Sequence, residues 1–461
     1  MKKNILKNYL IAASADLLIL LIFIYYLASP GARGDATQFK FVVINNLFLP
    51  FMICKFLVYY YLFPSFNKKG GIHRIKDIDP SALLGRSQVN LNRKDIGSYI
   101  KNRVVLVTGA GGSIGSELCF QIGSFSPKMI VLLERAESHL YEIDIALKKQ
   151  FGHVKIVPQL ADIQSRKQLE DIFRRYEPAI VFHAAAYKHV PILESHPWKA
   201  VRNNIAGTIN LVKTSKKFNA DRFVLVSTDK AVCPTNVMGA SKRIAEMIVQ
   251  NQNTDELLST KFMTVRFGNV IGSSGSVIPL FQKQIAEGGP VTVTHPDVTR
   301  FFMTTREACQ LILQAGSMTK GGEIYILDMG EPVNILSMAV DLIRQSGFEV
   351  GKDLEIVFTG LRPGEKLHEE LIISGERTIK TDHDKIMILK SFVMDRVFLY
   401  KNVHALIAAA KDQNPSDIRA RIKVIVPEYT PDTSYENVDA GYMPESDSLS
   451  GKENRSVVNF E

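Results

Sequence analysis

Two long apolar runs open the chain and set its beginning apart from the rest. Residues 8–29 (NYLIAASADLLILLIFIYYLAS) are long enough to cross a bilayer as one helix. A second run, residues 41–63, is interrupted by two asparagines, a proline and a lysine. It predicts either a second span, which we favour, or an interfacial helix. We therefore expect a transmembrane helical hairpin over residues 1–66 and a linker over residues 67–95.

Basic residues flank the two runs in a pattern that orients the hairpin. Lys2, Lys3 and Lys7 precede the first run, and a second basic group follows the second run from Lys68 onward. Because Lys and Arg collect on the cytoplasmic side of membrane spans, both ends of the hairpin are expected in the cytoplasm. The large remainder of the chain is then expected on the cytoplasmic side of the lipid bilayer.

From residue 96 the pattern changes to short apolar strands that alternate with amphipathic helices. Strand patterns occupy VVLV, MIVLLERAE, KIVPQLADI, AIVFHAAAYKHV and RFVLVSTDK, and helical patterns such as SRKQLEDIFRRY lie between them. This alternation predicts an α/β fold with a doubly wound parallel (Rossmann) sheet. We place that domain at residues 96–271, a smaller C-terminal lobe at 272–426, and an acidic, disordered tail at 427–461.

A glycine-rich turn follows the first strand and opens the first helix of this domain. Gly109, Gly112 and Gly115 stand three residues apart, and Ser113 and Ile114 complete the turn. Glycines let the backbone turn tightly beside a pyrophosphate, and the helix N-terminus supplies N–H donors and partial positive charge. A strand, glycines and a helix in this order predict a dinucleotide site.

The ends of the following strands carry residues placed to complete the dinucleotide site. Glu134 favours the ribose hydroxyls of NAD, whereas the adjacent Arg135 suits the phosphate of NADP. We favour NAD, because the acid comes first at the strand end, and leave NADP open. The residues at the ends of the third and fourth strands that we expect to contact the cofactor are Asp162, Ile163, Ala184 and Ala185.

The formal net charge of +9 restricts the class of partner only in part. The tail is acidic, so the excess of Lys and Arg lies in the body of the chain and near the apolar runs. The sequence has no finger spacing and no aromatic–basic interleaving of an RNA-binding type, so we expect no nucleic acid partner. An anionic small substrate and a lipid surface explain the charge more simply.

The four cysteines point to neither a metal nor a disulfide framework. Cys54, Cys119, Cys233 and Cys309 are far apart and form no C-x-x-C pair. We expect reduced thiols and no metal site. Cys233 lies in the stretch with the candidate chemistry, where we interpret it as a small packed residue rather than a nucleophile.

The stretch STDKAVCPTNVMGASK, residues 227–242, carries the candidate chemistry at the carboxyl edge of the sheet. Thr228, Asp229 and Lys230 place a hydroxyl, an acid and a base side by side. The stretch resembles the catalytic corner of short-chain dehydrogenase/reductases, which usually have a tyrosine four residues before the active-site lysine. Here Met238 stands four residues before Lys242. A thioether cannot carry a proton, so either the site is inactive or its proton chemistry lies elsewhere.

Five sequence blocks resemble one family closely, and together they span Arg103 to Leu371. The blocks are LVTGAGGSIGSEL, FHAAAYKHVPILE, STDKAVCPTNVMGASKR, VRFGNVIGSSGSVIPLF and TGLRPGEKLHEEL. They are similar to the extended short-chain dehydrogenase/reductases that dehydrate UDP-N-acetylhexosamines across C4–C6, in the membrane-tethered branch that serves bacterial polysaccharide synthesis. Long members of that family resemble this chain in having methionine at the tyrosine position, so Met238 indicates a sub-branch rather than an inactive enzyme.

The resemblance implies a redox-neutral 4,6-dehydration, in which C4 is oxidised, water is eliminated across C5–C6 and hydride returns to C6. It implies Asp229 as the acid for the leaving hydroxyl and Lys230 as the base at C5. The acid must carry a proton and the base must lack one, which burial against substrate and cofactor favours and a simple ion pair does not. Thr228 is expected at the C4 oxygen and Lys242 at the nicotinamide ribose. The base for the C4 hydroxyl stays open between Thr228 with Asp229 and a water near Lys242.

Further positions are expected to contact the UDP-sugar. Lys188 and His189 follow the fourth strand, near the sugar or the diphosphate. Asn204 either supports the proton network or is an ordinary helix-surface asparagine. Arginine suits a diphosphate because its fork donates two hydrogen bonds at once. The residues expected to bind UDP or sugar are Asn269, Arg300, Arg362 and Glu365. For Arg362 and Glu365 we favour substrate binding over a structural salt bridge.

The resemblance also implies the setting and leaves two rival functions. It places a UDP-N-acetylglucosamine 4,6-dehydratase at the bacterial inner membrane, as a homo-oligomer by analogy, with residues 272–426 as the substrate lobe. Long family members carry more spans and a further Rossmann-like domain, whereas here only the stretch from Met1 to about Asp79 stands in their place. The resemblance therefore does not extend to regulation placed in that domain. The rivals are a nucleotide-sugar 4-epimerase and a non-catalytic membrane scaffold; the hexosamine stays open.

Overall fold

The computed structural model describes residues 89–254, 260–273, 275–373, 376–390 and 393–432. Both predicted spans, residues 8–29 and 41–63, lie outside these residues, as do most of the linker and of the tail. Among the helices in the described part of the chain, none has the length and the apolar character to traverse a bilayer.

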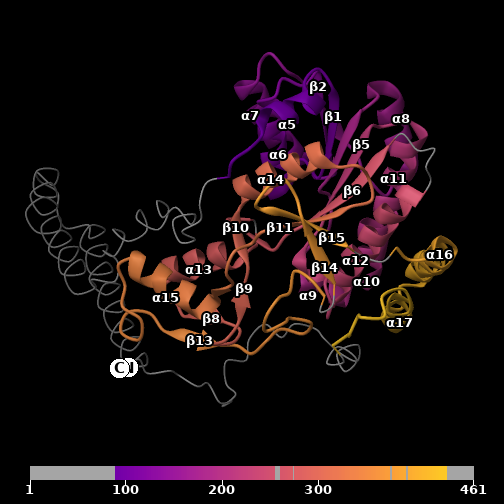
Figure 1. Cartoon of the computed structure of the whole chain (residues 1–461). Helices are drawn as coiled ribbons and strands as arrows, with labels where there is room; N and C mark the ends of the chain where they lie inside the picture. The colour runs from indigo at the N-terminus through magenta and orange to yellow at the C-terminus, as the bar shows by residue number, and fades with distance from the viewer. Residues whose placement is uncertain (1–88, 255–259, 274, 374–375, 391–392, 433–461) are drawn as a thin grey trace, which may run out of the picture. The chain divides into compact units, whose positions relative to one another are not determined.

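A nine-stranded sheet forms the frame of the described residues (Figure 1). All five strands predicted from the sequence are present. The seven strands from β3 to β11 pair in parallel, and β15 and β14 add an antiparallel edge. The strands, in spatial order, are β3 (Lys155–Leu160), β2 (Met129–Glu134), β1 (Val104–Thr108), β4 (Ile180–His183), β5 (Arg222–Val226), β6 (Lys261–Arg266), β11 (Ile324–Leu327), β15 (Ile386–Lys390) and β14 (Arg377–Lys380).

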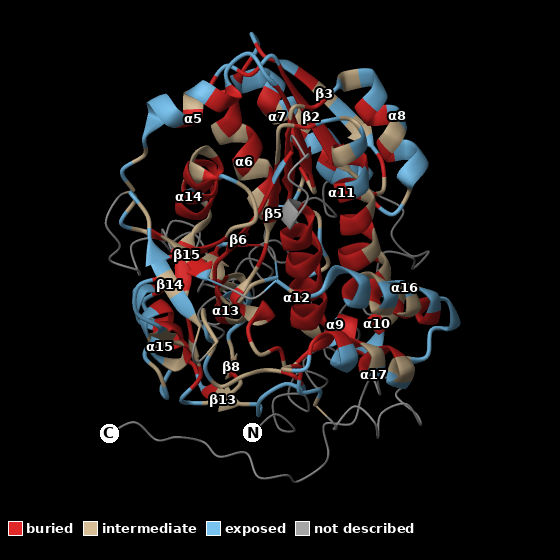
Figure 2. Cartoon of the chain, turned by 45° about the vertical axis from the view of Figure 1, so that its right-hand side comes forward, coloured by how far each residue is buried: buried red, intermediate tan, exposed pale blue. Residues whose placement is uncertain are grey.

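Helices cover both faces of this sheet, as the alternating pattern predicts. Side chains at Val105 and Val107 of β1 pack in one apolar cluster with α5, α6 and α14, whereas Val104 and Leu106 pack in another with α8, α11 and α12. Strands buried on both faces are typical of parallel sheets (Figure 2). The helices are α5 (Arg93–Ile100), α6 (Ser113–Gly123), α14 (Thr305–Met318), α8 (Arg166–Tyr176), α11 (Gly207–Lys217), α12 (Val237–Gln250) and, beside β2 and β3, α7 (Glu137–Gln150).

The strand order fixes where a ligand can enter the sheet. Reading outward from β1, one half runs through β2 and β3 and the other through β4, β5 and β6. This is the order of dinucleotide-binding sheets, and it reverses between β1 and β4. The crevice at that reversal lies beyond the carboxyl ends of the strands, where the glycine turn and the Ala184–Ala185 segment both emerge.

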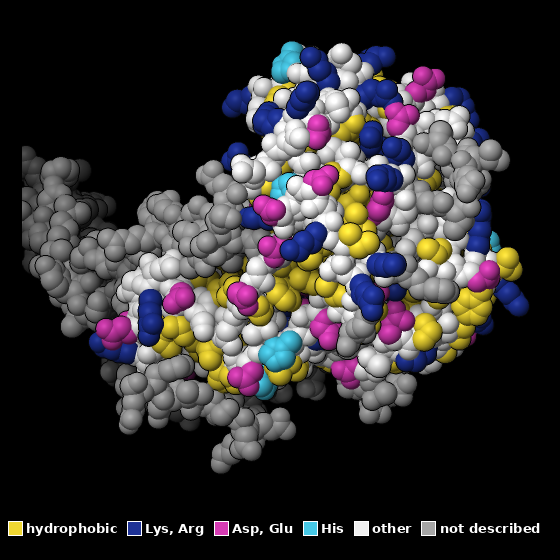
Figure 3. Space-filling model, viewed as in Figure 1, with side chains coloured by type: hydrophobic (Ala, Val, Ile, Leu, Met, Phe, Trp, Pro, Cys, Tyr) yellow, Lys and Arg dark blue, Asp and Glu magenta, His cyan; other side chains and the backbone are white. Residues whose placement is uncertain are grey.

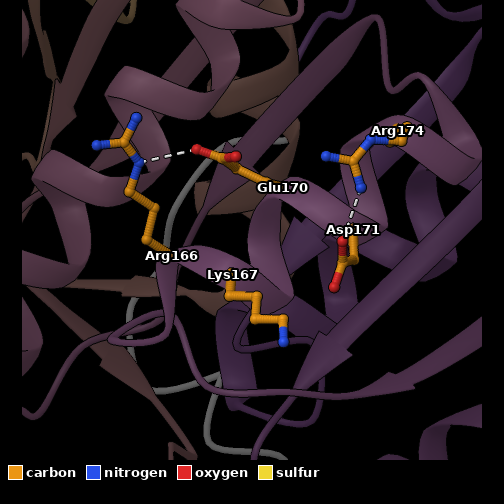
Figure 4. Close-up of a pocket in the computed structure, with 5 residues that line it drawn as sticks. All are labelled: Arg166, Lys167, Glu170, Asp171 and Arg174. Atoms are coloured by element: carbon orange, nitrogen blue, oxygen red, sulfur yellow. Dashed lines mark hydrogen bonds and ion pairs between the residues drawn. The ribbon is translucent and has the colours of Figure 1, made fainter.

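Helix α8 confirms its predicted amphipathic pattern and shows how its outer charges are used. Ser165 caps the helix by accepting a hydrogen bond from the Gln168 amide. On the outer face Arg166 pairs with Glu170 at 2.9 Å and Arg174 with Asp171 at 2.7 Å (Figure 4). The shallow hollow between these side chains is therefore a solvated, mutually paired helix face, and we assign it no ligand.

Surface charge on the face seen in Figure 3 is mixed. Lys and Arg side chains lie among Asp and Glu side chains there and form no continuous basic stripe. The excess positive charge of the sequence is therefore not gathered into one patch on that face.

The second lobe is smaller than predicted. Its own apolar cluster joins α13 (Val277–Ala286), β8 (Val291–Val293), α15 (Ile335–Gln345) and β13 (Ile356–Phe358), with β8 and β13 paired in parallel. The predicted single lobe over residues 272–426 is wrong, because α14, β11, β15 and β14 return to the large sheet. Apolar strands that complete an existing sheet carry the same pattern as strands that begin a new one.

The last helices also belong to the nucleotide-binding side. Helices α16 (Arg396–Asp412) and α17 (Pro415–Ile425) pack against α10 (Pro197–Ala200), and their buried side chains join one apolar cluster with α12. This cluster separates them from the second lobe, to which the sequence assigned them.

The predicted tail starts too early, because residues 427–432 are packed. Tyr429 is buried, the Thr430 amide donates to the Pro234 carbonyl, and Asp432 accepts from the Gly364 amide at 2.9 Å. These six residues join the catalytic stretch to the loop that contains Gly364. An acidic composition signalled a tail, but local contacts hold its first residues.

A buried ion pair holds the carboxyl ends of β5 and β6 to α12. Glu246 and Arg266 are fully buried, and their closest atoms are 2.7 Å apart. Glu246 also accepts a hydrogen bond from Ser227 at 2.6 Å and pairs with Arg243 at 3.3 Å. Burial raises the pKa of Glu246, but the Arg266 and Arg243 guanidiniums and the Ser227 hydroxyl outweigh it, so the pKa is lowered. The carboxylate is therefore charged at neutral pH.

We predict that Glu246→Gln destabilises the fold strongly, because Arg266 is left buried without its counter-charge. Breaking a buried pair from one side costs about 3–5 kcal/mol. Chemical denaturation followed by circular dichroism measures the loss. Asp171→Asn removes an exposed pair on α8 and should leave the unfolding midpoint almost unchanged. Equal midpoint shifts in the two variants would contradict the role given to Glu246.

Candidate active site

The glycine turn lies against the end of β4, as a dinucleotide site requires. Gly109 has φ +65°, and a Cβ there would lie 2.8 Å from the Ala185 Cα. A Cβ on Gly115 would meet the Gly109 carbonyl, so the first turn of α6 closes directly onto the loop. Helix α6 begins at Ser113 behind Gly112, which has no side chain to cap it. The turn, the Ala184–Ala185 segment and the helix N-terminus together form a cradle for an anion.

Glu134 turns its carboxylate toward the glycine loop. Its Oε2 accepts from the Gly111 amide at 3.2 Å, and its Oε1 accepts from the amides of Arg135 and Ala136 at 2.9 and 3.0 Å. The Arg135 guanidinium stacks over the Tyr187 ring, 4.4 Å from its centroid. The Glu134 carboxylate therefore faces the predicted cofactor position, whereas the Arg135 guanidinium is turned to the Tyr187 ring.

The two residues expected at adenine have different surroundings. Asp162 accepts from the Gln164 amide at 2.9 Å in the turn that leads into α8. Ile163 is 3% exposed and packs on Gly207, where a Cβ would lie 2.6 Å from its Cδ1. Asp162 thus lies at the partly exposed edge, whereas Ile163 belongs to the core.

A buried histidine that the sequence analysis did not single out supports this edge. His183, at the end of β4, has Nδ1 2.8 Å from Thr108 Oγ1 and Nε2 2.9 Å from Thr208 Oγ1. Burial, and then Lys242, lower its pKa to about 3, so the ring is neutral. Because Thr208 donates to the Asn204 carbonyl, the hydrogen bonds run in one direction from Thr108 to Asn204.

Asn204 is buried, and its side-chain amide is fully hydrogen-bonded. It is 2% exposed, so the helix-surface alternative is wrong. Its Oδ1 accepts from the Tyr187 amide and its Nδ2 donates to the Tyr187 carbonyl and to Ser241 Oγ. Both amide hydrogens are used, which leaves none for the predicted substrate contact. The one-turn π-helix η4 (Val201–Ala206) places this residue, and such turns are frequent at functional sites.

Lys188 and His189 lie where the sequence predicts, at the end of β4, and both side chains are exposed. A Cβ on Gly275, which has φ +71°, would lie 2.6 Å from the His189 Cε1. The imidazole therefore rests on the loop that follows β7 (Asn269–Ile271). Partial burial against this loop lowers the pKa of the otherwise exposed His189, and the Lys188 charge lowers it further.

Asp229 is fully buried. It begins the short 3₁₀ helix η5 (Asp229–Ala231), which follows the end of β5 after two intervening residues. Its Oδ1 accepts from Thr228 Oγ1 at 2.8 Å, from the Lys230 amide at 2.8 Å and from Lys230 Nζ at 3.1 Å. Its Oδ2 is buried and has no hydrogen-bond partner among the described residues. All three hydrogen bonds of the carboxyl group thus go to Oδ1, and Oδ2 has none among the described residues.

Lys230 donates to two acceptors and forms an ion pair with a further carboxylate. Its Nζ lies 3.1 Å from Asp229 Oδ1, 3.0 Å from Asn269 Oδ1 and 3.6 Å from Glu369 Oε1. Burial lowers the pKa of Lys230, but the carboxylates of Asp229 and Glu369 outweigh it, so the pKa is raised. The described residues therefore form the ion pair that favours the charged amine, and the effect expected from burial against substrate and cofactor stays a prediction. Glu369 was not singled out from the sequence, and Asn269, expected at UDP, contacts the candidate base.

The first turn of α12 approaches the catalytic stretch at backbone distance. A Cβ on Gly239 would overlap the Lys230 carbonyl, so only glycine fits there. Lys242 is buried and donates to the Val226 carbonyl at 2.6 Å. Burial lowers its pKa to about 8, against the opposing charge of Glu246. Met238 is 4% exposed and packs in the apolar cluster of α10, α12, α16 and α17.

Arg300 and Glu365 meet each other directly. Arg300 NH2 donates to Glu365 Oε1 at 2.9 Å, and NH1 donates to the carbonyls of Thr299 and Leu367. The salt-bridge alternative is therefore what the structure shows for Glu365. Arg362 is exposed, and its guanidinium has no hydrogen bond or ion pair with the part of the chain that the structure describes.

Comparison with known proteins agrees with this geometry. The family described as polysaccharide biosynthesis protein matches residues 105–391. The capsular polysaccharide biosynthesis protein CapD of Staphylococcus aureus is 49% identical over 316 residues, which cover 68% of this chain and 52% of CapD. The probable polysaccharide biosynthesis protein EpsC of Bacillus subtilis is 47% identical over 350 residues, covering 76% of this chain and 57% of EpsC.

The chain thus spans little more than half the length of these two curated relatives. Among solved structures, Pen from Bacillus thuringiensis is 32% identical, with a TM-score of 0.60, and the match covers 65% of this chain and 92% of Pen. The family match extends from β1 to the end of the antiparallel edge and includes the whole catalytic stretch. The chain belongs to the polysaccharide biosynthesis protein family.

Proposed function

We propose that the chain is an NAD-dependent nucleotide-sugar 4,6-dehydratase that acts on a UDP-N-acetylhexosamine, with UDP-N-acetylglucosamine as the favoured substrate. The product is the corresponding 4-keto-6-deoxy sugar. Three observations support this proposal: the dinucleotide cradle, the buried Asp229–Lys230 pair at the edge of the same sheet, and the match to a polysaccharide biosynthesis family.

One observation carries the assignment of the acid. Asp229 Oδ1 accepts three hydrogen bonds, whereas Oδ2 is buried without a partner among the described residues. Buried polar atoms are rarely left unpaired, so an unpaired one needs an explanation. A substrate hydroxyl directed at Oδ2 supplies one. The Oδ2 atom is therefore the expected donor to the C6 oxygen when water leaves.

The cradle fits a dinucleotide, and the residues around it can divide the remaining chemistry. A bound NAD supplies the acceptor for hydride from C4 and the donor that returns it to C6. The 4-ketone acidifies the C5 proton, which Lys230 removes while Asp229 protonates the leaving oxygen. Thr228, which donates to Asp229, lies beside the same carboxyl group. The Lys242 ammonium, at the end of β5, adds positive charge where the C4 oxygen becomes negative.

The resting ion pair is compatible with these roles. Moving one proton from Lys230 Nζ to Asp229 gives a neutral amine and a protonated acid without changing the total number of bound protons. Lys230 Nζ is 3.1 Å from Asp229 Oδ1, which allows direct transfer to that oxygen. Rotation of the carboxyl group about its Cβ–Cγ bond then turns the proton to the position of Oδ2, where it can pass to the C6 oxygen. Substrate and cofactor exclude water from the site, and burial without solvent disfavours both charges. Ligand binding therefore favours the form that the reaction uses.

The two rivals fit the site less well. A 4-epimerase needs no base at C5 and no acid at C6, so the adjacent Asp229 and Lys230 would have no task. A non-catalytic scaffold gives no reason for a buried carboxyl oxygen without a partner. The dehydratase uses both features.

We also propose that residues 1–66 anchor this enzyme in the bacterial inner membrane, with the catalytic part in the cytoplasm. The apolar runs and their flanking lysines support this placement. Assembly as a homo-oligomer is proposed by analogy alone.

We predict that the full chain, given UDP-N-acetylglucosamine and NAD, forms a product lighter by one water that carries solvent deuterium at C5. Asp229→Asn and Lys230→Met should each lower the rate about 10²–10⁴-fold, as expected when an acid or a base is removed. Mass spectrometry and NMR measure both quantities. Asp171→Asn on α8 is the control. An isomer of unchanged mass without C5 deuterium would establish epimerisation instead.

We predict that the chain binds NAD more tightly than NADP. The Glu134 carboxylate, held by three backbone amides, would repel the extra phosphate of NADP. Glu134→Gln should reduce the preference, whereas Glu137→Gln on the exposed first turn of α7 should not. Calorimetric titration with both cofactors measures the ratio. A wild-type preference for NADP would show that Arg135 decides the choice.

We predict a fall in kcat/KM above pH 8. Lys242 is needed as the ammonium, its pKa is about 8, and its charge is lost as the pH rises through that value. The ratio kcat/KM reports groups of the free enzyme, so the fall should appear there. Lys242→Arg stays charged, and any activity that it retains should lack the fall. A wild-type profile that stays flat to about two units above neutrality would remove Lys242 from this role.

A further inference from the structure

A third carboxylate lies within reach of the candidate base. Glu369 follows the LRPGEK loop, and its side chain is 5% exposed. Its Oε1 is 3.6 Å from Lys230 Nζ and 4.0 Å from Arg300 Nε. Its Oε2 is buried without a hydrogen-bond partner among the described residues. A carboxylate in such a place is costly unless the cations beside it compensate for lost solvent.

We propose that Glu369 is a positioning residue that holds Lys230 in its charged form until substrate enters the site. This inference rests on the proposed function, in which Lys230 must lose its proton before it can act. Glu369 touches neither the reacting carbons nor the cofactor in this assignment. It acts through the amine that it faces.

The charges around Lys230 show why Glu369, rather than Asp229, has this effect. Asp229, Glu369 and Arg300 are the charged groups that face Lys230, and Asn269 is neutral. Proton transfer between Asp229 and Lys230 turns the pair neutral from within. Glu369 opposes that transfer, because its negative charge favours the ammonium. A neutral amine therefore requires the influence of Glu369 to be reduced.

The position of Glu369 in the chain links its effect on Lys230 to the substrate site. Glu369 comes four residues after Glu365, which is bonded to Arg300, and seven after the exposed Arg362. The residues expected at UDP and the residue that holds the base thus share one segment. A UDP-sugar that engages this segment acts on the carboxylate that faces Lys230. The base is then released in the presence of substrate and stays protonated in its absence.

The test measures the charge of Lys230 directly in the full chain without substrate. Lysines are labelled with ¹³C at Cε, and the Lys230 signal is identified by its loss in Lys230→Arg. Glu369→Gln removes a negative charge, so the pKa of Lys230 should fall, by about one pH unit or more for a charge at this distance. Glu370→Gln is the matched control, since Glu370 is 55% exposed and pairs with Lys366 instead. It should leave the titration in place.

Two outcomes would overturn the inference: Glu369→Gln and Glu370→Gln giving the same Lys230 titration, or Glu369→Gln raising the pKa. Glu369→Asp keeps the charge at a greater distance and should shift the titration less, in the same direction. It serves also if the glutamine variant fails to fold, which a thermal melt detects. Because the titration needs no turnover, it decides the role of Glu369 even if the dehydratase assay fails. A merely structural ion pair with Arg300 would change the melt and leave Lys230 unmoved.

Discussion

The buried carboxylate of Glu246 is the interaction on which the rest of the site depends. It joins Ser227 at the end of β5, Arg266 at the end of β6 and Arg243 on α12. Arg243 in turn pairs with Glu428, just after the last helix. Ser227 directly precedes the residues that carry the proposed chemistry. An ionised group with three partners in the interior fixes the point where that stretch leaves the sheet, because any displacement would leave a charge unpaired.

Close backbone packing then fixes where the stretch goes next. Gly239 lets α12 touch the Lys230 carbonyl, and a Cβ on Gly268 would lie 3.1 Å from Asp229 Oδ2. The acid and base are therefore confined between a helix and a neighbouring loop without any side chain between them. The backbone is packed as closely at the other end of the crevice, where Gly109 contacts Ala185. A site built this way places proton donor, proton acceptor and cofactor against one rigid sheet edge, which supports reactions that need fixed geometry.

The sequence predicted what depends on local pattern and missed what depends on contacts between distant segments. Strands β1 to β5 and the glycine turn follow from apolar periodicity and glycine spacing, so they could be located in advance. The second-lobe boundary could not, because β11 and β15 look the same whether they extend one sheet or start another. The sequence analysis singled out Glu365 and missed Glu369, because the two share one irregular loop with Glu370, where no periodicity tells the three carboxylates apart. His183 gave no signal either, since a histidine closing an apolar strand reads equally as a ligand or as a neutral core residue.

The charges of the site also decide between the two arginines expected at the diphosphate. Asp229, Lys230, Glu369, Arg300 and Glu365 form an alternating series in which each neighbour lies within 4.0 Å of the next. Three carboxylates and two cations leave this series negative, which does not attract an anionic ligand. Arg300 donates through both terminal nitrogens to the protein, so a phosphate would have to displace existing partners. Arg362 is exposed, and its guanidinium has no hydrogen bond or ion pair with the described residues. The guanidinium that meets UDP first is therefore expected to be Arg362, and its loop also carries the carboxylate that faces the base.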